Sequence, residues 1–312
     1  MLAGANIKET RYLIAAIAAT IVCAAVIVLI PVLGQWLGIP FNNDTPTITA
    51  DSTPTHLPPA SRATPLPIVA ELKDEWIRPA DGMTMLYVPP PAGPFELGSG
   101  IMAPLEAYWI DKHPITNAQY QLCVADGLCK PSARINDTNY NGDNQPVVSI
   151  SWFDALDYVG WLNRTMPADT DWHYALPDEA MWEYAAVGET GWEYPWGDEF
   201  DGTLLNFCDI NCRGRWKVDN WNDGYRYTSP VGSYPAGASW VGALDLAGNV
   251  WEWTDSWWDE EETRRIVRGG SWYFPQSSAR AFSYDLFRPE TRTTSVGFRV
   301  VVVGRSPSHP DH

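Results

Sequence analysis

Residues 248–253 read Gly-Asn-Val-Trp-Glu-Trp, and two shorter blocks follow: Arg-Gly-Gly-Ser-Trp at 268–272 and Gly-Phe-Arg at 297–299. Each block combines glycine with an aromatic side chain. The whole chain shares this composition, with 17 tryptophans, 24 glycines and 26 prolines among 312 residues. Many aromatic anchors together with many turn residues favour a loop-rich domain, in which aromatic packing replaces long regular elements.

Upstream of these blocks the sequence predicts three helices. Thr116 is a suitable N-cap for a helix that runs to about Ala125. Ser151 and Asp154 have near capping-box spacing at the start of a second helix, and Asp178 is expected to cap a third. Short strands are expected at 85–89, 95–98 and 108–112.

The blocks together resemble the formylglycine-generating enzyme, or sulfatase-modifying factor, family. Residues 115–120 are similar to the family's VTNAQY block, and residues 176–186 to its LPTEAEWEYAA block. The similar segments span about residues 84–303. The resemblance implies an α+β, irregular, loop-rich domain of the C-type-lectin-like kind over residues 76–304, with 305–312 as a tail.

The N-terminal part has a different character. Residues 13–34 contain no charge and are long enough to cross a hydrocarbon core of about 30 Å. Basic residues precede this run within residues 1–12, so the positive-inside rule predicts a cytoplasmic N-terminus and an extracytoplasmic main domain. Residues 35–75 are rich in proline and threonine and are expected to form an extended linker. A cleaved signal peptide is the alternative to a retained membrane anchor.

Charge and cysteine content narrow the environment. The net charge of −17 disfavours nucleic acid and suits divalent cations or a basic partner, although solubility alone also explains it. Four cysteines follow the apolar run: Cys123, Cys129, Cys208 and Cys212. The even count favours disulfides, with local pairing the simplest of three connectivities. A four-cysteine zinc site is the alternative, with spacings that differ from the usual two-residue knuckles.

Two calcium sites are expected. Asp245 and Glu252 flank a glycine-containing turn whose carbonyls add to the oxygen ligands that calcium needs. The resemblance implies a first site formed by these two side chains with the carbonyls of Gly248 and Val250. It implies a second site formed by Asn206 and Asp223 with the carbonyls of Phe207 and Tyr225. Alternatively, Asp245 and Glu252 are turn residues that accept hydrogen bonds from backbone amides.

The family's enzymes bind copper(I) with two cysteines five residues apart, between the second and third blocks, and oxidise a client cysteine to formylglycine. The corresponding positions here are Ala279 and Tyr284, and residues 213–312 contain no cysteine. Copper(I) prefers thiolate ligands. We therefore expect neither copper binding nor formylglycine-generating activity.

The remaining prediction is a binding module with a protein or peptide partner. Aromatic and arginine side chains suit a binding surface. The candidate groove residues are Trp251, Phe274, Arg280, Phe282, Tyr284 and Arg288. Alternatively, these aromatic side chains fill the space left by the missing metal. A different functional alternative is a metal-dependent oxidoreductase with altered ligands. Arg268 and Arg299 lie within the similar blocks and have a structural expectation: each is expected to pair with a buried carboxylate.

Overall fold

The computed structural model describes residues 70–304 except 168–169. The predicted cytoplasmic segment 1–12, the apolar segment 13–34, most of the linker 35–75 and the tail 305–312 lie outside the described residues. Within the described ranges, no helix is long and apolar enough to cross a membrane. Membrane anchorage through residues 13–34 therefore stays a prediction.

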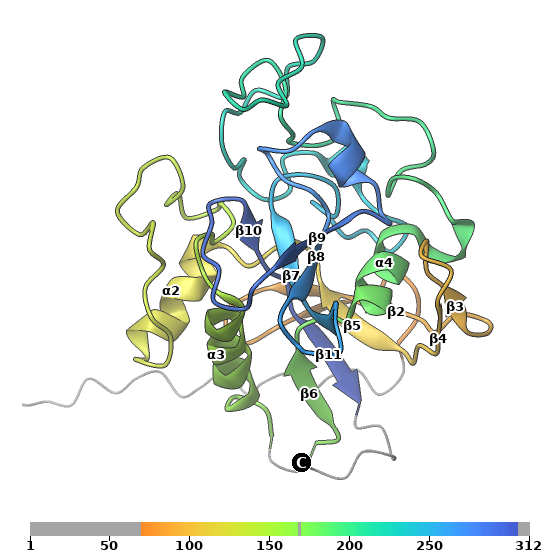
Figure 1. The fold of residues 1–312 in the computed structure, drawn as a ribbon. Helices are drawn as coiled ribbons and strands as arrows, with labels where there is room; N and C mark the ends of the chain where they lie inside the picture. Colours follow the sequence, from red (N-terminus) through yellow and green to blue (C-terminus); the bar gives the residue numbers. More distant parts are fainter. Residues whose placement is uncertain (1–69, 168–169, 305–312) are drawn as a thin grey trace, which may run out of the picture. The chain divides into compact units, whose positions relative to one another are not determined.

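A five-stranded antiparallel sheet joins the two ends of the described chain (Figure 1). Its strand order is β1-β2-β5-β11-β6. The bounds are Glu75–Ile77 for β1, Thr84–Val88 for β2, Tyr108–Asp111 for β5, Val301–Gly304 for β11 and Trp172–Ala175 for β6. The valines of β11 suit a strand with neighbours on both sides, because β-branched side chains pack well on a pleated surface. The expected strands near 85–89 and 108–112 are confirmed as β2 and β5.

A second sheet carries all three diagnostic blocks. Its order is β10-β7-β8-β9, with bounds Val296–Gly297, Trp251–Trp257, Arg265–Arg268 and Tyr284–Phe287 respectively. Strand β10 runs parallel to β7 and places Gly297 opposite Glu252, while β8 places Arg268 opposite Glu252 from the other side. Two further strands, β3 (Phe95–Glu96) and β4 (Met102–Ala103), form a separate hairpin.

The three predicted helices are confirmed, with the expected caps. Helix α2 (Asn117–Ala125) and helix α3 (Trp152–Asn163) both begin with a complete capping box. Helix α4 (Glu179–Val187) begins at Asp178, whose side chain accepts a hydrogen bond from the Met181 amide. Three short 3₁₀ turns complete the list: η1 (Gly188–Thr190), η2 (Pro235–Gly237) and η3 (Gln276–Ala279). Figure 1 shows α2 and α3 to the left of the second sheet and α4 to its right.

Aromatic side chains dominate the interior. One core cluster contains Trp109, Trp161, Trp251 and Trp253, together with the inward faces of α2 and α3. A second cluster surrounds Trp182 of α4. Between α4 and β7, about sixty residues form only turns and short 3₁₀ segments. The structure is thus a mixed α and β, loop-rich fold, as the composition predicts.

Two local disulfides stabilise the loops. Cys123 pairs with Cys129, and Cys208 pairs with Cys212. The local pairing predicted from the sequence is confirmed, and the four-cysteine zinc alternative is wrong because all four sulfurs are in disulfide bonds.

Candidate functional site

A buried ion pair joins the first and third blocks. Glu252 and Arg299 are both fully buried, and the guanidinium forms two hydrogen bonds to the carboxylate, of 2.6 and 2.8 Å. The Trp182 indole donates a third, of 2.7 Å. Arg299 also donates to the carbonyl oxygens of Asp111 and Leu244. One arginine thus connects strands of both sheets, and its predicted pairing with a buried carboxylate is confirmed.

A second buried pair joins α4 to the Arg-Gly-Gly-Ser-Trp block. Arg268 donates to one carboxylate oxygen of Glu183, and the other oxygen accepts a 2.6 Å hydrogen bond from the Gly98 amide. Arg268 also donates to the carbonyl of Ala281, so the same guanidinium positions the segment after η3. Gly98 lies so close to Phe282 that an added Cβ would be 2.4 Å from the phenylalanine Cβ. These contacts fix one wall of the cavity that Gly98, Glu183 and Phe282 line.

The first set of predicted calcium ligands has other partners in the structure. Glu252 accepts hydrogen bonds from Arg299 and Trp182, as described above. The Asp245 carboxylate accepts a 2.6 Å hydrogen bond from the Gly232 amide, and burial raises its pKa to about 6. Gly248 adopts a positive φ of 78° and lies against the Asn206 carbonyl, where a Cβ would clash. Calcium binding by these oxygens and by the Val250 carbonyl stays a prediction.

The second set includes an oxygen without a partner. Asn206 is buried, and its amide nitrogen donates to the Tyr227 carbonyl. Its side-chain oxygen has no hydrogen-bond partner among the described residues. The Asp223 carboxylate accepts from the amides of Phe207 and Tyr225, and burial raises its pKa to about 7. Buried polar oxygens are nearly always satisfied. The orphaned oxygen of Asn206 and the buried carboxylate of Asp223, which accepts from the amide of the next residue, Phe207, fit a cation in this loop.

Asp209 belongs to the same loop, although the predicted calcium ligands do not include it. It is fully buried, and its carboxylate accepts a hydrogen bond of 2.5 Å from the Asp223 amide. Its negative charge further raises the pKa of Asp223. Its position between Cys208 and Cys212 could have indicated it, because a disulfide between residues four positions apart holds the intervening carboxylate in a fixed position.

The two positions that the sequence predicts to match the family's copper ligands, Ala279 and Tyr284, differ in environment. Ala279 ends η3, is 1 % exposed and packs against Leu205, Phe207 and Ala247. Tyr284 begins β9, is 43 % exposed and lies with its ring 5.1 Å from that of Trp258. One position is a small core residue and the other a surface aromatic. Among the described residues, no group of three or more His, Cys, Asp or Glu side chains is arranged to hold a metal ion.

The predicted groove residues do not surround one common cavity. Trp251 is 1 % exposed and packs edge-on against Phe274 in the core, so it offers no surface to a ligand. Arg280 forms an ion pair of 2.9 Å with Glu193. Arg288 lines a separate depression of about 410 Å³ beside Phe153 and Trp257.

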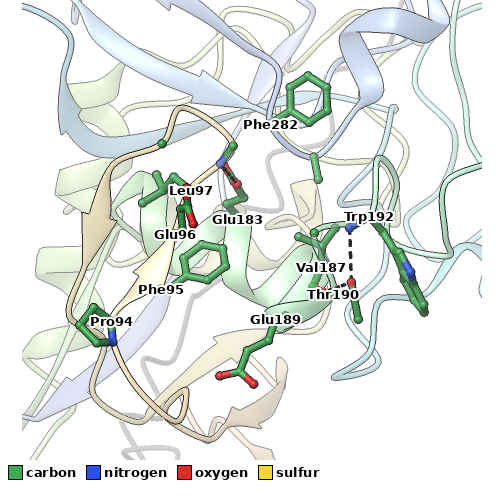
Figure 2. A pocket seen from close by; sticks show the side chains of 15 residues that line it. Pro94, Phe95, Glu96, Leu97, Glu183, Val187, Glu189, Thr190, Trp192 and Phe282 are labelled. Carbon is green, nitrogen blue, oxygen red and sulfur yellow. Dashed lines mark hydrogen bonds between the residues drawn. The ribbon is translucent and has the colours of Figure 1, made fainter.

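Phe282 lies between Ala279 and Tyr284 in the sequence and lines a cavity of about 550 Å³. Figure 2 shows this cavity from close by. Helix α4 contributes Glu183, η1 contributes Glu189, and the loop after η1 contributes Trp192. Strand β3 contributes Phe95 and Glu96. No sequence pattern indicates these residues as a group, because they come from three separate segments, 94–100, 183–192 and 281–282, that only the fold brings together.

The fold and these buried pairs define a class of loop-rich α and β domains. The family model described as the sulfatase-modifying factor enzyme 1-like domain matches residues 78–303, and the chain belongs to this family. The formylglycine-generating enzyme of Thermomonospora curvata is 32 % identical over 178 residues, which cover 50 % of this chain and 55 % of that protein. The "Inactive C-alpha-formylglycine-generating enzyme 2" of Bos taurus is 30 % identical over 170 residues, 52 % of each chain. The chain thus spans about half the length of these curated relatives.

A solved structure confirms the fold. PvdO from Pseudomonas aeruginosa superposes with a TM-score of 0.59 at 21 % identity, covering 75 % of this chain and 99 % of that one. At this identity the similarity concerns the fold alone.

Proposed function

We propose that this chain is a non-catalytic, ligand-binding member of the family, held outside the cytoplasm by a membrane anchor at residues 13–34. The environment of Ala279 and Tyr284 carries the proposal. An alanine has no metal-ligating atom, and the tyrosine side chain lies on the surface against Trp258. Copper(I) needs soft sulfur ligands, and neither side chain supplies one. The Bos taurus relative is itself named as inactive, which supports loss of activity within the family.

Calcium is the cofactor we propose, in a structural role. The second ligand set is supported by the unpartnered oxygen of Asn206 and by the buried carboxylate of Asp223. A bound divalent cation would provide the positive charge that these oxygens lack. Binding of the cation to the folded chain alone would add stability to a region with few helices and strands.

The test of the functional proposal is an activity assay on the 312-residue chain. The protein is loaded with copper(I) and incubated in air with a Cys-x-Pro-x-Arg peptide, and aldehyde formation is measured by mass spectrometry. We expect no aldehyde above the rate with copper alone. The positive control is a cysteine-containing family enzyme treated in the same way. Enzymatic turnover by this chain would refute the proposal and favour an oxidoreductase with altered ligands.

The anchor is tested separately, because the two parts of the proposal can fail independently. One sample of intact cells that express the chain is treated with protease from the outside, and membranes isolated from a second, untreated sample are washed with alkaline carbonate. We expect the chain to stay in the washed membranes and its main domain to be digested. Release by carbonate would show that residues 13–34 do not span the bilayer.

A further inference from the structure

The cavity beside α4 combines carboxylates with exposed aromatic rings. Three glutamates line it, and none of the residues that line it is a lysine, arginine or histidine. Arg268 balances the charge of Glu183 from behind the wall, because the two side chains form a buried ion pair. Glu96 and Glu189 have no such cationic partner within the described residues. The cavity therefore has two uncompensated negative charges at its rim.

The two rim carboxylates have different degrees of freedom. One oxygen of Glu189 accepts a 2.9 Å hydrogen bond from the Ala92 amide, which fixes its direction, and the other oxygen is free to accept. The Glu96 side chain is exposed and has no hydrogen bond or ion pair among the described residues. Both groups can therefore accept hydrogen bonds from a ligand without first losing an internal partner, which lowers the cost of binding.

Aromatic surface accompanies these charges. Trp192 is 37 % exposed and Phe282 is 39 % exposed, although both side chains are large and apolar. Figure 2 shows Phe282 at the top of the cavity, Trp192 at the right and Glu189 below. A cation is attracted to the face of an aromatic ring, and the attraction adds to that of a nearby carboxylate. Apolar rings next to unpaired carboxylates suit a group with an alkyl stem and a charged end.

We propose that this cavity binds a lysine or arginine side chain of a partner polypeptide. A polypeptide fits better than a free small cation because the apolar surface continues outside the cavity, on the hairpin that forms its wall. Ile101 and Met102 of this hairpin are 57 % and 55 % exposed. The net charge of −17 also favours approach of a basic partner. The inference deepens the proposed binding function and rests on it.

The experiment measures binding of fluorescein-labelled peptides to the 312-residue chain in zwitterionic detergent at low salt. The probes share one leucine-containing, cysteine-free sequence whose central residue is lysine, arginine, acetyl-lysine or norleucine. We expect saturable anisotropy changes for the two cationic probes only, weakened by added salt. Equal binding of the acetyl-lysine probe would overturn the proposal. Spermidine that competes as strongly as the lysine peptide would show that the ligand is a free polyamine and would also overturn it.

Variants locate the site. Glu96→Gln and Glu189→Gln keep the side-chain shape, and each is expected to weaken binding about two- to fivefold, as for an exposed ion pair. Phe282→Ala is expected to weaken it about three- to tenfold through lost ring contacts. The matched control is Glu260→Gln, which makes the same charge change at an exposed position away from the cavity. An equal loss in the control would mean that only overall charge matters.

The two proposals fail in different ways. Aldehyde formation with the Cys-x-Pro-x-Arg substrate would overturn the non-catalytic function, whatever the cysteine-free probes show. Absence of binding by both cationic probes, in a chain without aldehyde formation, would overturn only the ligand class proposed for this cavity.

Discussion

Removal of the Arg299 guanidinium is the sharpest test of how the domain is held together. Arg299→Met keeps a long side chain but leaves the buried Glu252 carboxylate with Trp182 as its one remaining partner. It also removes the donors to the carbonyls of Asp111 and Leu244. Breaking a buried ion pair from one side typically costs about 3–5 kcal/mol, and orphaned buried acceptors add to this cost. We expect a loss of about 5 kcal/mol in the free energy of unfolding.

This loss is large compared with the stability of a typical domain, about 5–15 kcal/mol. For a domain of this size, about 1 kcal/mol shifts the Tm by roughly 2–4 °C, so we expect a Tm lower by about 10–20 °C. Urea unfolding followed by tryptophan fluorescence gives the same quantity at constant temperature. The control is Arg264→Met, at an exposed position one residue before β8, which is expected to cost less than about 0.5 kcal/mol.

A double variant tests whether the unpaired charge of Glu252 causes the loss of stability in Arg299→Met. Because the single variant leaves an uncompensated buried charge, replacing Glu252 by methionine as well should restore about 2 kcal/mol or more relative to Arg299→Met. A Tm shift below about 3 °C in the single variant would refute the reasoning. A double variant that loses the sum of both single costs would refute the ion pair as its cause. Measurement with EDTA and with calcium separates the pair from the predicted metal role of Glu252.

Three further predictions concern other parts of the molecule. Calcium should raise the Tm of the parent chain and of an Asp198→Asn control, and should raise the Tm of Asn206→Ala less. Thermal unfolding with calcium or with EDTA measures these shifts, and equal Tm shifts in all three chains would contradict the second calcium site. Burial raises the pKa of Asp111 to about 7, against the opposing charge of its buried partner Arg78. A folded-state pKa above the unfolded value predicts that stability falls as the pH rises from about 4 to 7; urea unfolding across this range should show a smaller fall in Asp111→Asn, and an unchanged slope would contradict the raised pKa. Replacing Cys208 and Cys212 by serine should cost about 2 kcal/mol in the free energy of unfolding, as expected for a short closed loop. Because reduction of the parent chain also opens the Cys123–Cys129 disulfide, the urea midpoint of the variant should lie between those of the oxidised and reduced parent chains; a midpoint equal to that of the oxidised parent would exclude this origin.

The local features were predictable from the sequence, because their causes lie within a few residues. Thr116 with Gln119 and Ser151 with Asp154 form the capping boxes that the spacing indicates. The disulfides are equally local. The pairing of Arg299 with some buried carboxylate was also expected, but its identity as Glu252, 47 residues away, depends on the parallel alignment of β10 with β7.

The candidate site was much less accessible to prediction. The ligand groups of the cavity come from β3, α4, η1 and the segment after η3, and no periodic pattern links them. The groove hypothesis included Trp251 because aromatic side chains suit a binding surface. In the structure it lies in β7 with the same inward direction as Trp253, two residues on, and both are buried. Four consecutive residues of β7, 251–254, are buried, so this part of the strand is covered on both faces and offers no surface to a ligand.

The position of β11 has a consequence for how the domain is made. Val301–Gly304 lie between β5 and β6 in the first sheet, so Val301 pairs with Ile110 and with Ala175. A ribosome must therefore release almost the whole described chain before these strands have their common neighbour. Pairings between such distant positions form slowly. The nascent chain consequently carries unpaired edges on β5 and β6 until β11 is synthesised, and such edges are the sites at which a partly made domain is prone to aggregate.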